Sequence, residues 1–125
     1  MNKIKSFTDL VAWQEARQLS LLIYRTTMSF PKEELYCLTS QIRRSAISIS
    51  SNIAEGFSRP YYKDKVKFYF IALGSLTETQ NQILLAKDLN YLSEEGFKLI
   101  ADKTILTHKL INGLIKASRI RFLNS

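Results

Sequence analysis

Polar residues at one end of an otherwise apolar segment, SNIAEGFSR (Ser51–Arg59), raise the question of a reactive or ligand-binding site. At 100° per residue, five polar residues of one predicted helix fall within an arc of about 80°: Gln41, Ser45, Ser48, Asn52 and Glu55. Buried polar groups must be paired, and a paired set fixes helix register. We therefore expect a structural network rather than a ligand or catalytic site. Its expected members are Gln41, Arg44, Ser48, Asn52, Glu55 and Glu78, with Arg44 paired to Glu55 or Glu78.

The chain has one cysteine, Cys37, and one histidine, His108. His108 shares a helical stripe with Phe97 and Ile111, which favours a core or interface imidazole over a Cys37–His108 nucleophile pair. The sequence contains no P-loop, G-x-S-x-G, G-x-G-x-x-G or H-E-x-x-H motif, and no repeated Glu-x-x-His pattern of a di-metal bundle. We expect a protein that is not an enzyme and that has no cofactor and no metal.

The basic residues are more suggestive, because the net charge is +7 and an anionic partner such as nucleic acid is favoured. Lysine and arginine meet phosphates, and the interleaved tyrosines Tyr61, Tyr62 and Tyr69 could stack on unpaired bases. The alternative is a solvated helix face beside core aromatics. The candidate contacts are Arg59, Lys63, Lys65 and Lys67 in one group, Lys116, Arg119 and Arg121 in a second, and Arg43 as a weaker one.

Four segments with helical periodicity must position these residues, and with only 4 Gly and 2 Pro the chain can hold long helices. The expected helices span about 8–27, 40–55, 60–89 and 93–121. Thr39 and Ser93 are expected N-caps, and Gly56 and Asn90 are expected to end helices in the left-handed conformation. Short loops favour antiparallel neighbours. The sequence thus predicts an all-α, antiparallel up-down four-helix bundle in a single domain, residues 1–125.

The last two helices carry more apolar surface than a monomeric bundle needs. Beside its core stripe, the third has a second one that includes Phe70 and Leu84, and the fourth has one that includes Leu106, Leu110 and Leu114. Large exposed apolar patches usually mark interfaces, so we expect a homo-oligomer. The alternative is a core face that wraps further round each helix.

No intramolecular disulfide is possible with one cysteine, which fits a reducing cytoplasm. The residues MNKIKSFTDL contain no apolar region of a signal peptide, and no apolar run approaches the length of a membrane span. We expect a cytoplasmic protein with no membrane partner.

The segments DLVAWQEAR, FPKEELYCLTSQIRRSAISISSNIAEGFSR and FYFIALGSLTE resemble the bacterial 23S rRNA intervening-sequence protein family over about residues 7–115. The resemblance implies an antiparallel four-helix bundle that assembles as a homopentamer. The sequence is also similar to the accessory protein of diversity-generating retroelements, a basic pentameric bundle that works with a reverse transcriptase and nucleic acid. The family defines no catalytic residue, and Cys37 stands where the family has glycine.

The leading hypothesis is a non-enzymatic oligomeric bundle that binds RNA or DNA through basic surfaces, with recognition dominated by the nucleic-acid backbone. The alternative is a protein-interaction scaffold, or an accessory subunit for a nucleic-acid enzyme such as a reverse transcriptase.

Overall fold

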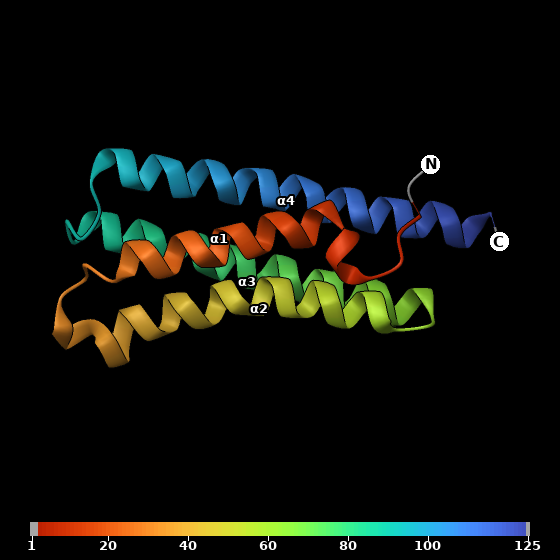
Figure 1. Cartoon of the computed structure of the whole chain (residues 1–125), viewed down its shortest axis with the longest axis horizontal. Coiled ribbons are helices and arrows are strands. Elements are labelled where there is room, and N and C mark those ends of the chain that lie inside the picture. Colours follow the sequence, from red (N-terminus) through yellow and green to blue (C-terminus); the bar gives the residue numbers. More distant parts are fainter. Residues whose placement is uncertain (1–2, 125) are drawn as a thin grey trace.

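Four long helices form the molecule in a computed structural model, which describes residues 3–124. They are α1 (Val11–Thr27), α2 (Ser40–Ser58), α3 (Tyr62–Asp88) and α4 (Glu94–Leu123). Each helix runs opposite to the one before it, and α4 also packs against α1, so the four close into a bundle (Figure 1). The prediction of an all-α, antiparallel up-down four-helix bundle is confirmed, and residues 3–124 include no strand.

The core lies along the bundle axis and takes one stripe from each helix. These stripes recur at three- and four-residue spacing, as the sequence predicts. Their buried apolar members include Ala16, Leu19 and Ile23 from α1, Ile42, Ala46, Ile49 and Ile53 from α2, Tyr69, Ala72, Leu76 and Ile83 from α3, and Ile100 and Ile111 from α4.

Three boundaries of helical segments follow local capping chemistry. Ser6 and Asp9 form a capping box on a short 3-10 turn, η1 (Phe7–Asp9), after which the extended Leu10 delays α1 to Val11. Ser93 accepts a hydrogen bond from the backbone of Gly96 and begins α4, as predicted. Asn90 has φ of 62°, which confirms its left-handed position after α3.

Gly56 does not end α2, contrary to the prediction. It lies buried inside the helix, which continues to Ser58. Pro60 ends the helix instead, because proline holds the preceding residue in an extended conformation; Arg59 has φ of −75° and ψ of 137°. A Cβ atom at Gly56 would lie 2.7 Å from the Tyr69 ring and 3.0 Å from the backbone oxygen of Lys65. Glycine is therefore needed here for the close approach of α2 and α3.

The expected N-cap at Thr39 is also wrong. Two short helical turns, η2 (Lys32–Glu34) and the π-type η3 (Leu35–Thr39), lead directly into α2. Thr39 is itself helical and makes no side-chain cap. The break lies earlier, at Cys37, where φ is −122° and ψ is −108°, and there the Glu34 side chain accepts from the backbone of Leu38.

Candidate nucleic-acid interface

The two basic groups of the sequence lie at one end of the bundle, although about 50 residues separate them along the chain. The α2–α3 connection and the end of α4 meet there (Figure 1). The Tyr62 ring stacks on the Phe122 ring with 4.6 Å between centroids and 13° between planes, which joins the two helices. The two basic groups come together because, in an up-down bundle, α2 ends, α3 begins and α4 ends at the same end of the molecule.

Charge is unevenly shared between the two ends of the molecule. We call the end with the α2–α3 connection the basic end. By their place in the chain, its cations are Lys3 and Lys5 before η1, Arg59, Lys63, Lys65 and Lys67 around the connection, and Lys116, Arg119 and Arg121 in the last turns of α4; its carboxylates are Asp9, Glu55 and Asp64. At the opposite end carboxylates and cations balance: Glu33, Glu34, Asp88, Glu94, Glu95 and Asp102 against Arg25, Lys32, Arg43, Arg44, Lys87 and Lys98. The excess of positive charge in the composition is thus concentrated at the basic end.

Five of the predicted contacts at the basic end are free to meet an anion. All five side chains are exposed, and none makes a hydrogen bond or ion pair with another residue in the range 3–124. They are Lys63, Lys67, Lys116, Arg119 and Arg121. Such side chains can reach phosphates without first breaking an internal contact.

Arg59 is partly engaged within the chain. Its guanidinium lies 3.4 Å from a carboxylate oxygen of Glu55 and 4.7 Å from the centroid of the Phe68 ring. The side chain remains 44% exposed, so its outer edge can still contact a phosphate. Glu55, which was expected in the buried network, instead forms this surface ion pair.

Lys65 has a structural role that the sequence prediction missed. Its Nζ donates a 2.6 Å hydrogen bond to the backbone oxygen of Phe57, so it satisfies a carbonyl at the end of α2. The pKa of this ammonium is lowered, first by burial and second by the charge of Arg121. Lys65 therefore fastens the α2–α3 connection, and its predicted contact with a phosphate stays a prediction.

The three tyrosines differ sharply in exposure. The Tyr61 side chain is 71% exposed, whereas Tyr69 is 1% exposed and packs beneath Gly56. Burial raises the pKa of Tyr69 to about 12. Tyr69 cannot stack on a base, which corrects that expectation, and Tyr62 has one face covered by Phe122.

Arg43 does not belong to the basic end. It lies in the first turn of α2, at the other end of the bundle, and its Nε donates to the Thr27 hydroxyl at 2.9 Å. Its guanidinium also lies 4.7 Å from the centroid of the Tyr24 ring. Arg43 therefore ties α2 to α1 and lies apart from the other candidate contacts; its predicted contact with nucleic acid stays a prediction.

Comparison with known proteins places the chain in a family. The family model described as "23S rRNA-intervening sequence protein" matches residues 8–113, most of the chain. The chain belongs to this family. The match includes the whole α2–α3 connection, whereas Lys116, Arg119 and Arg121 lie beyond it. No curated protein sequence matches the chain.

A solved structure shows the same fold. It is a crystal structure of a protein of unknown function from the S23 ribosomal protein family of Bacteroides thetaiotaomicron. The two chains are 22% identical with a TM-score of 0.77, over 85% of this chain and 99% of that one. At this identity the likeness shows the bundle fold alone.

In this family member, polar side chains between α2 and α3 form two groups, which are linked where the Thr79 hydroxyl donates to the Ser75 backbone oxygen at 2.9 Å. In the first, Thr79 donates to Ser45 at 2.8 Å, Ser45 donates to the Gln82 carbonyl at 2.8 Å, and the Gln82 amide donates to Glu78 at 3.2 Å. Glu78, a predicted member, therefore lies at the outer end of this group. The Ser45–Thr79 contact is buried inside the bundle and fixes the register of the two helices.

The second group contains two other predicted members, Ser48 and Asn52. The Asn52 amide donates to the Ser48 hydroxyl at 3.0 Å, and that hydroxyl lies 2.8 Å from the hydroxyl of Ser75. Ser75 and Thr79 on α3 were not predicted. Their signal in the sequence is two small hydroxyl residues four apart, on the side of α3 that packs against α2.

Gln41 and Arg44 are outside both groups, which corrects their assignment. Both side chains are exposed and make no hydrogen bond or ion pair with any residue in 3–124. Arg44 pairs with neither Glu55 nor Glu78. Both residues lie on the side of α2 that the helical wheel predicted, but at the edge of that side, where their side chains meet solvent.

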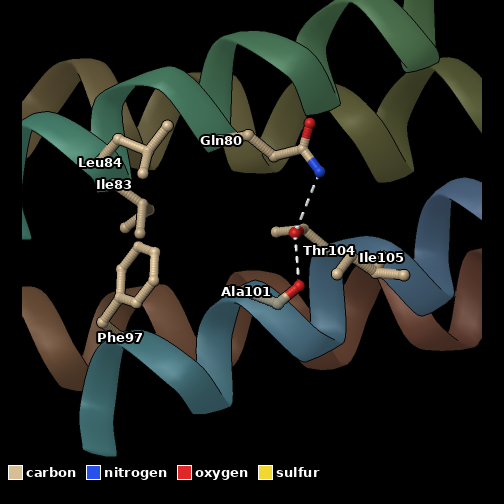
Figure 2. Close-up of a pocket in the computed structure, with 7 residues that line it drawn as sticks. All are labelled: Gln80, Ile83, Leu84, Phe97, Ala101, Thr104 and Ile105. Carbon is tan, nitrogen blue, oxygen red and sulfur yellow. Dashed lines mark hydrogen bonds between the residues drawn. The ribbon is translucent and has the colours of Figure 1, made fainter. Parts of the chain in front are cut away.

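An apolar pocket lies between α3 and α4, on the outer face of the bundle (Figure 2). Its volume is about 240 Å³, and its lining residues are Gln80, Ile83, Leu84, Phe97, Ala101, Thr104 and Ile105. The Gln80 amide donates to Thr104 at 3.1 Å, and Thr104 donates to the backbone oxygen of Ala101 at 2.7 Å. These polar groups are thus paired across the pocket.

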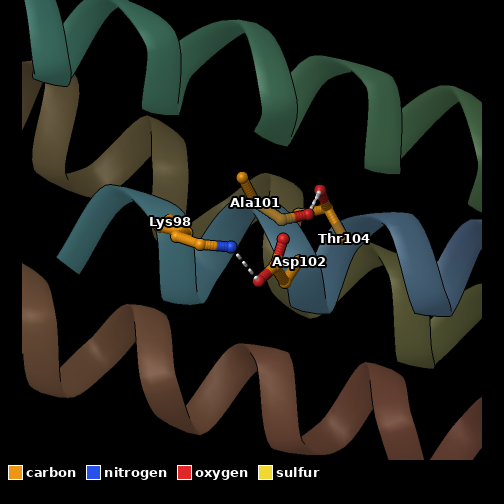
Figure 3. A network of polar contacts seen from close by, with 4 residues as sticks. All are labelled: Lys98, Ala101, Asp102 and Thr104. Carbon is orange, nitrogen blue, oxygen red and sulfur yellow. Dashed lines mark hydrogen bonds and ion pairs between the residues drawn. The ribbon is translucent and has the colours of Figure 1, made fainter. Parts of the chain in front are cut away.

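No titratable side chain lines this pocket, which does not fit acid–base or nucleophilic chemistry there. An ion pair on α4, Lys98 to Asp102 at 3.1 Å, spans one turn of the helix at the surface (Figure 3). His108 is exposed, so it is not a core imidazole, and the other expectation, an interface imidazole, stays a prediction. Within residues 3–124 no group of side chains is arranged to hold a metal ion, and no helix is long and apolar enough to cross a membrane.

Proposed function

We propose that this protein is a non-enzymatic, oligomeric helical bundle of the cytoplasm that binds RNA or DNA through its basic end. The observation that carries the proposal is the set of five exposed cations without internal partners at an end that is poor in carboxylates. Contacts of this kind neutralise phosphates, release counterions and carry little sequence information. Recognition would therefore be dominated by the nucleic-acid backbone.

Binding across a salt series tests the proposal. We expect a labelled RNA or DNA strand to bind at low salt, and the logarithm of the association constant to fall linearly with the logarithm of salt concentration. Each phosphate contact adds about 0.7 to 0.9 to the slope, so five contacts give a slope of about −4. Absence of binding at low salt, or binding that does not change with salt, would contradict the proposal.

Self-association forms part of the same proposal. Leu84 and Ile105, on the two sides of the pocket, are 50% and 54% exposed, and Phe70 on the same side of α3 is 56% exposed. Such a surface favours a protein partner, and the family resemblance suggests five copies. Of the α4 residues expected in a second stripe, Leu110 and Leu114 pack against the core instead, so the proposed interface is narrower than the sequence indicated. Repeated basic ends would add their weak phosphate contacts together.

Charging the pocket rim is expected to dissociate the oligomer. Leu84→Glu with Ile105→Glu buries two carboxylates in any contact made there, which is unfavourable. We expect light scattering at micromolar concentration to give a multiple of the mass for the natural chain and the mass of one chain for the variant. The control is Met28→Glu, at a 79% exposed position directly after α1, and it should leave the mass unchanged. A natural chain with the mass of a monomer would contradict self-association.

The pocket also favours a second candidate, a scaffold or accessory subunit for a nucleic-acid enzyme. A partner could place an apolar side chain in the pocket, as the resemblance to retroelement accessory proteins suggests. A single protein retained on the natural chain after nuclease treatment, and lost with Leu84→Glu, would favour this candidate.

A further inference from the structure

We propose that the basic end recognises unpaired nucleotides, with the Tyr61 ring stacking on a base while neighbouring cations hold the phosphates. The inference rests on the proposed nucleic-acid binding and adds the class of ligand. Single strands differ from duplexes in offering open base faces, and an exposed aromatic ring among cations matches that chemistry.

Tyr61 is placed as a stacking platform. It lies directly before α3, with φ of −106° and ψ of 139°, and its side chain is 71% exposed. Its backbone oxygen accepts from the backbone of Lys65 at 3.0 Å, which fixes the main chain at the first turn of the helix. The side chain makes no hydrogen bond or ring contact within residues 3–124, so most of the residue's surface is open to a ligand.

Residues before and after Tyr61 in the α2–α3 connection are fixed by contacts with the helices. Arg59 is pinned between Glu55 and the Phe68 ring, and Lys65 is bonded to the end of α2. Tyr62, the next residue, is stacked on Phe122 of α4. A rigid connection loses little conformational entropy on binding, so an exposed ring on it binds better than one on a mobile loop.

The charge around Tyr61 distinguishes it from other exposed tyrosines. Lys63 follows two residues later in the chain, and Lys67 lies on the same early part of α3. Tyr36, at the opposite end, is 88% exposed but follows Glu33 and Glu34. The phosphates of a nucleic-acid strand are attracted to the cations near Tyr61 and repelled by the carboxylates near Tyr36. Tyr36 is therefore a matched control for ring exposure without the cations.

The test compares three labelled probes by fluorescence anisotropy: an oligothymidylate of about 16 nucleotides, the abasic strand of equal length, and a duplex with the same number of phosphates. We expect the natural protein to bind the oligothymidylate most tightly. Tyr61→Ala should weaken that binding about tenfold and leave the abasic and duplex probes unchanged, because only stacking is removed. Tyr61→Phe keeps the ring and should bind as the natural protein does.

Tyr36→Ala should leave all three affinities unchanged, and circular dichroism should show that each variant keeps its helix content. Equal binding of duplex and single strand, or an unchanged affinity with Tyr61→Ala, would overturn this inference and leave the proposed function intact. Binding of none of the probes at low salt would overturn both.

Discussion

Gly56→Ala is expected to lower the free energy of unfolding by about 1–3 kcal/mol, the range for overpacking a tight interior. The added methyl group would meet the buried Tyr69 ring at 2.7 Å and the Lys65 backbone oxygen at 3.0 Å. A ring that is 1% exposed cannot swing into solvent, and the backbone of α3 cannot yield without losing its own packing. Helices α2 and α3 must therefore separate. Urea unfolding should show a lower midpoint with an unchanged slope.

Gly74→Ala is the matched control, because Gly74 also lies inside a helix but has no atom within 4 Å of an added Cβ. Alanine is the better helix former by about 1 kcal/mol, so this variant should be more stable than the natural chain. Opposite signs for the two substitutions would show that contact with Tyr69, and not helix propensity, decides the role of Gly56. If Gly56→Ala is also stabilising, the close approach of α2 and α3 described here is wrong.

Neutralising three exposed cations of the basic end is expected to weaken nucleic-acid binding about 100-fold at a salt concentration of about 0.1 M. The variant carries Lys63→Gln, Lys67→Gln and Arg119→Gln, none of which forms a hydrogen bond or ion pair within residues 3–124. The fold should therefore be unaffected. The slope of the salt dependence should become shallower by about 2 to 3, since each of the three lost phosphate contacts contributes about 0.7 to 0.9.

Arg25→Gln, Lys32→Gln and Lys109→Gln together form the control for this experiment. These side chains are also exposed and lie outside the basic end, so the control has the same net charge as the first variant. Its affinity should fall less than threefold, because only long-range attraction is lost. Equal losses in the two variants would mean that total charge, and not the basic end, governs binding.

Hydrophobic periodicity was sufficient to predict the four helices and most of the core. Ile42, Ile49 and Ile53 recur at intervals that place them on one side of α2, and all three are fully buried. Ser93 and Asn90 show that local capping chemistry was also readable. Periodicity and capping depend on residues that are close to one another in the sequence, so they can be predicted from the sequence alone.

The errors arose where a distant residue decides the outcome. Gly56 followed by Phe57, Ser58 and Arg59 has the composition of a helix end, but Tyr69 of α3 requires a glycine there. In the sequence Lys65 looks like an ordinary surface lysine, but in the fold its ammonium donates a hydrogen bond to the backbone oxygen of Phe57. A helical wheel for one segment contains neither fact.

The candidate interface shows the same division. The sequence supplied the cations, but it gave two groups with no indication that they meet. Their union follows from the topology and from the stacking of Tyr62 on Phe122. Sequence reasoning also could not separate Arg43 and Lys65, which are engaged internally, from Lys63 and Lys67, which are not.

The central claim is that nucleic acid lies on the basic end, and photo-cross-linking tests it most directly. A strand containing a photoreactive uridine analogue would be bound at low salt and irradiated, and the linked peptides would be identified by mass spectrometry. We predict links in the stretch from Arg59 to Lys67 and in the last turns of α4, with Tyr61 among them. Links confined to the Lys32–Thr39 segment or to the pocket between α3 and α4 would contradict the account.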